Sequence, residues 1–585
     1  MIRNLPVLAL SALLLGGCQQ TDDPAETLAG LAGDAAIVEP INEPIEPAEL
    51  TEPTAAAAPE LPSVPGDGID AERYAGHLAA LASDAFEGRA PGTRGERVTL
   101  NYLVAEFAAL GLKPGYGDSF LQPVPMVEMT NEARSPLALS AQDQHWEMNF
   151  PQEMITWSRR AGLDAHAIED SELVFVGYGA VAPEYDWNDY AGMDFSGKTV
   201  VILVNDPGFA TGDERLFNGR AMTYYGRWTY KYDEAARQGA AAALIVHDTE
   251  PASYPWEVVI NSWSAAQFDL AESGDVPLMA IEGWITLDGA RDLFERSGQD
   301  FDALMERAKA PGFEPVPLGT TATASVRQSV RQGVSYNVLA EIPGAERSDE
   351  AVIYMAHWDH LGRNLAIPGS AGIYNGAIDN ASGTAGLLEI ARLYQESNPP
   401  ARSVLFLAVT LEEYGLLGSR YYANNPVFPP AATVAGINMD ALSLIGPTHD
   451  VVVVGYGSSE LEQILDRAVV RQGRRVVPEP TPEAGFYYRS DHFNFARAGI
   501  PALYAKGGVE HREHGREYGL AQERDYRDNR YHKPADEFNP DWDLRGVAED
   551  LELLYVVGRH LADGESWPNW YPGSEFRAIR DRQRP

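Results

Sequence analysis

The fold of this 585-residue chain follows from a short apolar segment, Ala351-Val352-Ile353-Tyr354-Met355-Ala356, which ends at His357. Two later segments share its character: residues 403–410 stop just before a glutamate pair, and residues 434–439 stop at an aspartate. Continuous apolar runs of this length are typical of strands that are buried on both faces of a parallel sheet. Residues 383–394, between the first two runs, repeat their apolar side chains with helical periodicity. This alternation of strand, helix and strand predicts an α/β domain.

Residue types that bind metal ions follow these predicted strands. His357, Glu412-Glu413 and Asp440 come directly after the three apolar runs. Because ligands bind outside the carboxyl ends of the strands in such sheets, we expect these side chains to converge on one edge. Zn²⁺ takes imidazole nitrogen and carboxylate oxygen as ligands. Two ions about 3.5–4 Å apart need a bridging carboxylate. A general base must stand beside the metals without becoming a ligand, so adjacent glutamates can divide these two tasks.

Asp359 lies two residues after His357 on an extended segment and therefore points to the same side. This position suits a carboxylate that fixes the tautomer of the His357 imidazole.

Five short motifs follow one another in the C-terminal half: His357-Trp358-Asp359-His360, Asp379-Asn380-Ala381-Ser382-Gly383, Glu412-Glu413-Tyr414-Gly415, Asn438-Met439-Asp440 and Tyr531-His532-Lys533-Pro534-Ala535-Asp536. This ordered set resembles the M28 family of co-catalytic zinc peptidases, which includes bacterial aminopeptidases and glutamate carboxypeptidases. The resemblance covers about residues 69–580. It implies a mixed, mostly parallel sheet flanked by helices and two Zn²⁺ per chain.

The resemblance also implies roles for single residues. His357 and Asp440 would be ligands of one zinc, Asp379 the bridging ligand, and Glu413 and His532 ligands of the other.

Glu412 would deprotonate the bridging water and later protonate the leaving amine, and Tyr531 would offer a hydroxyl to the tetrahedral intermediate. Ser490-Asp491-His492 belongs to the same family pattern, but we interpret His492 as a wall residue. His511 and His514 lie on a charged loop and are predicted to touch neither metal.

The resemblance favours an exopeptidase that hydrolyses peptides, first of all an aminopeptidase. One alternative is a carboxypeptidase that acts on acidic or glutamyl peptides, and Arg489, near the active-site motifs, keeps it open. Another is a non-catalytic peptide-binding lipoprotein, against which the intact Glu412 and ligand set argue. The sequence has no H-E-x-x-H or G-x-S-x-G motif, and its only cysteine is Cys18, so no single-zinc helix, serine elbow or thiol nucleophile is indicated.

The amino-terminal region predicts export and anchoring. Residues 1–17 have the pattern of a signal peptide. Leu15-Gly16-Gly17-Cys18 resembles a bacterial lipobox, which implies cleavage before Cys18 and attachment of lipid to it. Residues 18–68 are rich in Ala, Pro and Glu, with no Lys or Arg, and predict an extended tether. Gln19 then favours an outer-membrane lipoprotein, facing the periplasm or the cell exterior.

The formal net charge of -40 and a pI near 4.6 argue against nucleic-acid binding. They also argue against membrane adhesion other than through the lipidated Cys18. The expected partners are therefore peptide substrates, and the sequence sets no oligomeric state.

A second domain interrupts the predicted catalytic domain, which comprises residues 69–162 and 287–585. Strand-like runs at 172–179, 199–204 and 242–246, with a helix at 230–239, resemble a β-rich protease-associated (PA) domain over residues 163–286. In M28 enzymes such an insertion is inferred to act as a lid or in substrate selection, although a purely stabilising role fits this sequence equally well.

Overall fold

The computed structural model describes residues 60–264, 266–272, 277–572, 574 and 576–584. The predicted signal peptide, Cys18 and residues 18–59 of the predicted tether lie outside these ranges. Residues 60–68, which were predicted to belong to the tether, instead pack on the folded chain: Leu61 is buried, and Arg471 donates to the carbonyls of Leu61 and Pro62. Within the described ranges, no helix has an apolar stretch that would cross a bilayer.

The central strand of the first sheet is β14 (Arg347–His357). It pairs in parallel with β17 (Arg402–Val409) on one side and β18 (Thr433–Asn438) on the other. β21 (Ala502–Gly507) extends the parallel part beside β18, and β13 (Val316–Ile342) pairs antiparallel with β17. Beyond these strands, β1 (Lys113–Pro114) pairs antiparallel with β13, and β19 (Asp450–Val453) pairs antiparallel with β21. β20 (Arg475–Pro478) then pairs in parallel with β19. The predicted α/β fold with a mixed, mostly parallel sheet is confirmed.

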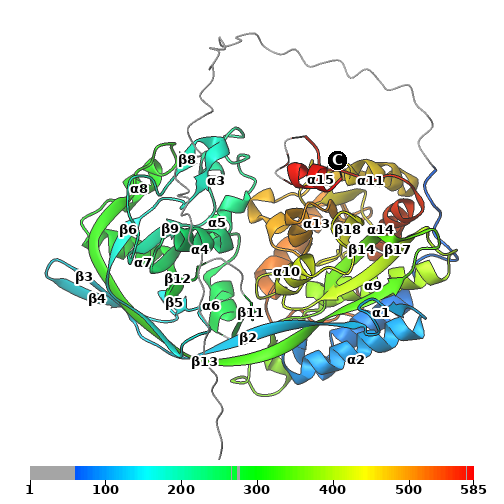
Figure 1. The fold of residues 1–585 in the computed structure, drawn as a ribbon, viewed down its shortest axis with the longest axis horizontal. Helices are drawn as coiled ribbons and strands as arrows, with labels where there is room; N and C mark the ends of the chain where they lie inside the picture. Colours follow the sequence, from blue (N-terminus) through cyan, green and yellow to red (C-terminus); the bar gives the residue numbers. More distant parts are fainter. Residues whose placement is uncertain (1–59, 265, 273–276, 573, 575, 585) are drawn as a thin grey trace, which may run out of the picture. The chain divides into compact units, whose positions relative to one another are not determined.

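Both faces of β14 are buried, as its unbroken apolar run predicts. Val352, Tyr354 and Ala356 join the hydrophobic core on one face, while Ile353 and Met355 join the core on the other. Helices cover these cores on both faces (Figure 1). The helices on the first face are α1 (Ala71–Leu81), α2 (Arg94–Ala109), α9 (Ser382–Gln395), α11 (Leu461–Val469) and α14 (Arg545–Asp563), and those on the second are α10 (Leu417–Asn424) and α12 (His492–Arg497).

The chain forms a second body with hydrophobic cores of its own, built from residues between Leu137 and Val326. This body is therefore wider in sequence than the predicted insertion, 163–286. Its strands are β3 (Leu137–Ala141), β4 (Gln144–Met148), β5 (Met154–Trp157), β6 (Ala165–Phe175), β9 (Thr199–Leu203), β10 (Ala242–His247) and β12 (Ile281–Thr286). Its main helices are α4 (Trp228–Arg237), α6 (Trp256–Ser264), α7 (Leu287–Arg296) and α8 (Phe301–Arg307).

One long strand connects the two bodies. β13 pairs with β17 through Val338–Ile342 and with β6 through residues 316–327, and β2 (Leu121–Arg134) lies antiparallel along its middle (Figure 1). The remaining elements are η1 (Asp84–Arg89), β7 (Val181–Ala182), η2 (Pro183–Tyr185), β8 (Trp187–Asn188), α3 (Pro207–Thr211), η3 (Tyr224–Gly226), α5 (Thr249–Ala252), β11 (Gln267–Leu270), β15 (Gly362–Arg363), η4 (Ser370–Gly372), β16 (Ile373–Tyr374), η5 (Ala377–Ala381), η6 (Val470–Gln472), η7 (Pro482–Ala484), η8 (Phe486–Tyr488), α13 (Gly515–Asp525), η9 (Tyr526–Arg530) and α15 (Arg577–Gln583).

Candidate metal centre

The candidate centre lies where the parallel strands end. His357 is the last residue of β14, Glu412 and Glu413 follow β17, and Asp440 follows β18. The other two predicted ligands come from loops: Asp379 from η5, just before α9, and His532 from the turn after η9. The structure brings all five predicted ligands and Glu412 together, although they span 176 residues of sequence, from 357 to 532.

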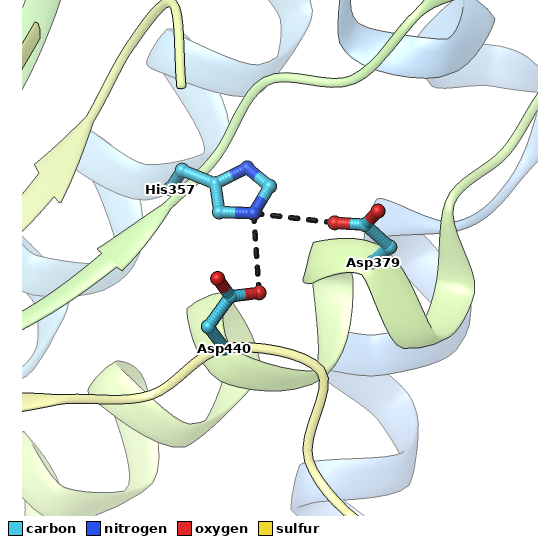
Figure 2. Close-up of side chains that lie close together, drawn as sticks. All are labelled: His357, Asp379 and Asp440. Atoms are coloured by element: carbon cyan, nitrogen blue, oxygen red, sulfur yellow. Dashed lines mark ion pairs between the residues drawn. The ribbon is translucent and has the colours of Figure 1, made fainter. Parts of the chain in front are cut away.

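His357 stands at the middle of the first group. Its Nε2 lies 3.2 Å from Asp379 Oδ1 and 3.4 Å from Asp440 Oδ1 (Figure 2). Glu412 Oε2 is 3.8 Å from the same nitrogen. Donor atoms of His357, Asp379 and Asp440 all lie within 4.8 Å of one another, so one ion can contact all three.

His532 and Glu413 form the second group. His532 Nε2 lies 3.0 Å from Glu413 Oε2 and 3.4 Å from Asp379 Oδ2. The two oxygens of Asp379 therefore face different imidazoles, Oδ1 toward His357 and Oδ2 toward His532. This is the arrangement that a carboxylate bridging two ions requires.

The arrangement fits a metal ion better than it fits a set of hydrogen bonds. His357 Nε2 is buried and has no hydrogen-bond partner among the described residues, yet carboxylate oxygens surround it. A buried nitrogen without a partner costs free energy unless something else occupies that space. Imidazole nitrogens and carboxylate oxygens are the donors that Zn²⁺ takes.

The electrostatics of the centre reflect crowded carboxylates. Burial alone would lower the pKa of His357, but the carboxylates of Glu412 and Asp440 raise it well above its usual range. Burial alone would raise the pKa of Asp379, but the imidazoles of His357 and His532 beside its two oxygens lower this pKa well below its usual range. Burial raises the pKa of Glu412 well above its usual range; His357 opposes this effect, and Glu413 and Asp440 add to it. Cations are thus favoured throughout the centre.

Asp359 acts on two neighbours. The Nδ1 of His357 lies 3.1 Å from the main-chain carbonyl of Asp359 and 3.9 Å from its carboxylate. The Nδ1–H group of His357 therefore donates to this carbonyl rather than to the predicted carboxylate, and that tautomer leaves Nε2 free for a metal. The carboxylate instead accepts a hydrogen bond of 3.1 Å from the amide of Glu412.

Tyr531, the predicted hydroxyl donor, lines the cavity beside the metal ligands. Its ring stacks on the imidazole of His532, with the ring centroids 4.0 Å apart. The structure thus places Tyr531 next to a ligand.

Two further polar residues contact the ligands, and the sequence did not predict these contacts. His360 Nδ1 lies 2.5 Å from Glu413 Oε1, and His360, Asp379 and Glu413 form a further group that could hold an ion. Ser490 donates a hydrogen bond of 2.5 Å to Asp440 Oδ2. Both residues stand in motifs that the sequence singled out, but neither the spacing nor the residue type shows which ligand each one touches.

A cavity of about 330 Å³ opens beside the centre. The metal-site carboxylates lie along one part of its wall, together with apolar side chains that include Leu442, Val454 and Trp542. The second body contributes Ser253 and Tyr254. His511 and His514 also line this cavity, but neither joins a metal-holding group among the described residues. The cavity can thus hold an organic substrate against the metal site.

Comparisons with known proteins agree with this geometry. Residues 337–556 match the family described as Peptidase family M28. Aminopeptidase NAALADL1 of Mus musculus is 37% identical over 139 residues, which are 22% of this chain and 17% of the mouse protein. Leupeptin-inactivating enzyme 1 of Streptomyces exfoliatus is 30% identical over 270 residues, which are 43% of this chain and 56% of that protein. The chain therefore spans less than two thirds of the length of either relative.

Among solved structures, an aminopeptidase from Aneurinibacillus sp. strain AM-1 superimposes with a TM-score of 0.49 and 19% identity. The superposition covers 85% of this chain and 95% of that one.

Proposed function

We propose that this protein is a zinc-dependent exopeptidase, and specifically an aminopeptidase, since residues 337–556 match peptidase family M28. The observation that supports the proposal most directly is the pair of imidazoles, His357 and His532, facing opposite oxygens of Asp379. Two Zn²⁺ per chain would account for this pairing. When bound, such ions lower the pKa of a coordinated water and polarise a peptide carbonyl.

The residues divide into two sets around Asp379. His357 and Asp440 would hold one ion, and Glu413 and His532 the other, with His360 and Ser490 fixing the orientation of Glu413 and Asp440.

Glu412 lies beside the ligands, 3.8 Å from His357 Nε2, with its amide fixed by Asp359. Because Glu412 is not one of the predicted ligands, its carboxylate would be free to take a proton from the attacking water and deliver it to the leaving amine.

Turnover on two matched peptide sets tests the proposal. One set has a free amino terminus and a blocked carboxyl end, and the other has the reverse. We expect the zinc-loaded protein to cleave only the free-amine set, and Glu412→Gln to lose activity by about 10²–10⁴-fold while it binds the same amount of zinc. Activity that persists in Glu412→Gln would rule out this assignment of the base.

A carboxypeptidase is the alternative, and two arginines near the cavity support it. Arg489 lines the cavity and lies over the rings of Tyr254 and Phe486, while its Nε has no partner. Arg227 is only 8% exposed, and its Nε also lacks a partner. Arg489 donates through Nη2 to the main-chain carbonyl of Ala252, at 3.1 Å, so its guanidinium is held there by a carbonyl rather than by a carboxylate. A substrate carboxylate would supply the missing partner.

The same assay separates the two readings. If the enzyme cleaves the free-carboxyl set, Arg489→Met and Arg227→Met should each raise KM for that set. Arg215→Met provides the matched control, because Arg215 is exposed in the second body and already pairs with Asp213. Cleavage of the free-amine set alone, unaffected by either variant, would exclude the carboxypeptidase.

A further inference from the structure

The loop that carries Asp379 is held by two buried charged residues that no catalytic role accounts for. This Asp379 loop, residues 375–379, turns at Gly376, where a Cβ atom would approach the His360 ring to 2.5 Å. The loop contributes the carboxylate that faces both imidazoles, so its position fixes the geometry of the whole centre.

Asp536 holds the amides of this loop. Its side chain is fully buried and accepts hydrogen bonds from the amides of Ile378, at 3.0 Å, and Asp379, at 3.1 Å. Its main-chain carbonyl accepts a third, from Ala377 at 3.0 Å. Because Asp536 lies four residues after His532, these bonds tie the segment that carries His532 directly to the segment that carries Asp379.

Arg89 holds the carbonyls of the same loop. Its guanidinium is fully buried and donates to the carbonyls of Asn375, at 2.6 Å, and Gly376, at 2.9 Å. Its Nε donates to the carbonyl of Trp358, the residue after His357, at 2.8 Å. A planar guanidinium presents its donors in a fixed fork, so it sets the distance between the segments that it joins.

We propose that Asp536 and Arg89 are positioning residues for the metal centre, which they assemble by tying the segments that carry His357, Asp379 and His532 to one another. Neither side chain is a ligand or takes part in proton transfer. Together they satisfy amides and carbonyls of one short loop, so Asp379 cannot shift toward one imidazole without breaking several buried hydrogen bonds. This inference rests on the proposed metal site.

Asp450 offers a matched control. It is 1% exposed and also accepts hydrogen bonds from two successive amides, those of Val509, at 3.2 Å, and Glu510, at 2.8 Å. It is not among the residues that could hold a metal. Asp450→Asn therefore reports the cost of weakening such a pair of bonds away from the centre.

The test measures metal binding and stability separately, on the full-length protein. Zn²⁺ affinity is measured by competition with a chromophoric chelator, coordination by the visible absorption of Co²⁺, and stability by thermal unfolding of the metal-free protein. We expect Asp536→Asn to weaken Zn²⁺ binding by about 10–100-fold and to change the Co²⁺ spectrum. Arg89→Lys keeps the positive charge but removes the planar set of guanidinium donors. It should also weaken Zn²⁺ binding and change the Co²⁺ spectrum.

Asp450→Asn should lower the melting temperature of the metal-free protein at least as much as Asp536→Asn, and leave Zn²⁺ affinity and the Co²⁺ spectrum unchanged. If Asp536→Asn and Arg89→Lys bind zinc like the wild type, the positioning role is wrong. If they fail to fold while Asp450→Asn folds, their role is purely structural and the proposal is again wrong. A wild type that binds no zinc would instead refute the proposed function.

Discussion

At the scale of single residues, the metal centre is built from buried groups whose charge depends on their surroundings. His492 shows the simplest case. It is fully buried at the start of α12, and burial alone lowers the pKa of its imidazole to about 3. Among the described residues, no metal-holding group includes it.

This burial predicts a pH dependence of stability. Because the folded pKa lies below the unfolded value of 6.5, the unfolded chain binds an extra proton between about pH 6.5 and pH 3. Lowering the pH through this window therefore favours unfolding, by up to about 1.4 kcal/mol per pH unit. In His492→Gln the free energy of unfolding should therefore fall less steeply as the pH is lowered, by up to about 1.4 kcal/mol per pH unit. Urea titrations of the metal-free protein from pH 7 to pH 4 measure it.

His145→Gln serves as the control, since His145 is exposed on β4. If His492→Gln and the wild type lose stability with the same slope, His492 is not neutral in the folded protein.

At the scale of elements, the strands at whose ends the ligands lie were predictable, because burial on both faces leaves an unbroken apolar run in the sequence. The predicted run 351–356 lies inside β14, and 403–410 overlaps β17 up to Val409. The course of β13 was not predictable: its pairing with both β17 and β6 depends on contacts between distant segments. The hydrogen bonds of Asp536 and Ser490 were not predictable for the same reason, because their partners lie 157 and 50 residues away in the sequence.

The packing of α14 on the central sheet predicts a sharp steric limit. Gly558 lies in α14 where a Cβ atom would come within 1.9 Å of the Tyr354 hydroxyl on β14. Gly558→Ala should therefore destabilise the protein by about 1–3 kcal/mol, because an overpacked core must shift. Denaturant unfolding measures this cost.

The same substitution at Gly76 in α1 should stabilise the protein rather than destabilise it. A Cβ atom there meets nothing within 4 Å, so Gly76→Ala should stabilise the helix by about 0.5–1 kcal/mol. Equal effects at the two positions would show that helix propensity, rather than the contact with Tyr354, decides the outcome.

At the scale of the whole molecule, net charge affects adsorption of the protein to anionic lipid but not anchoring by an attached acyl chain. The net charge of -40 opposes adsorption to anionic lipid. An acyl chain contributes about 0.8 kcal/mol per buried CH₂ regardless of protein charge. Since Leu15-Gly16-Gly17-Cys18 resembles a bacterial lipobox, we propose that the protein is anchored to the outer membrane by lipid on Cys18, which lies outside the described residues.

Fractionation of cells that express the full-length chain tests this anchor. We expect the wild type in the membrane fraction, retained through a high-salt wash and labelled by radioactive palmitate. Cys18→Ser should lose the label and leave the membrane fraction, while Gln20→Ala should behave like the wild type. Retention of Cys18→Ser through high salt would mean that something other than this lipid holds the protein. Because salt screens charge but does not weaken burial of an acyl chain, the wash separates the two explanations directly.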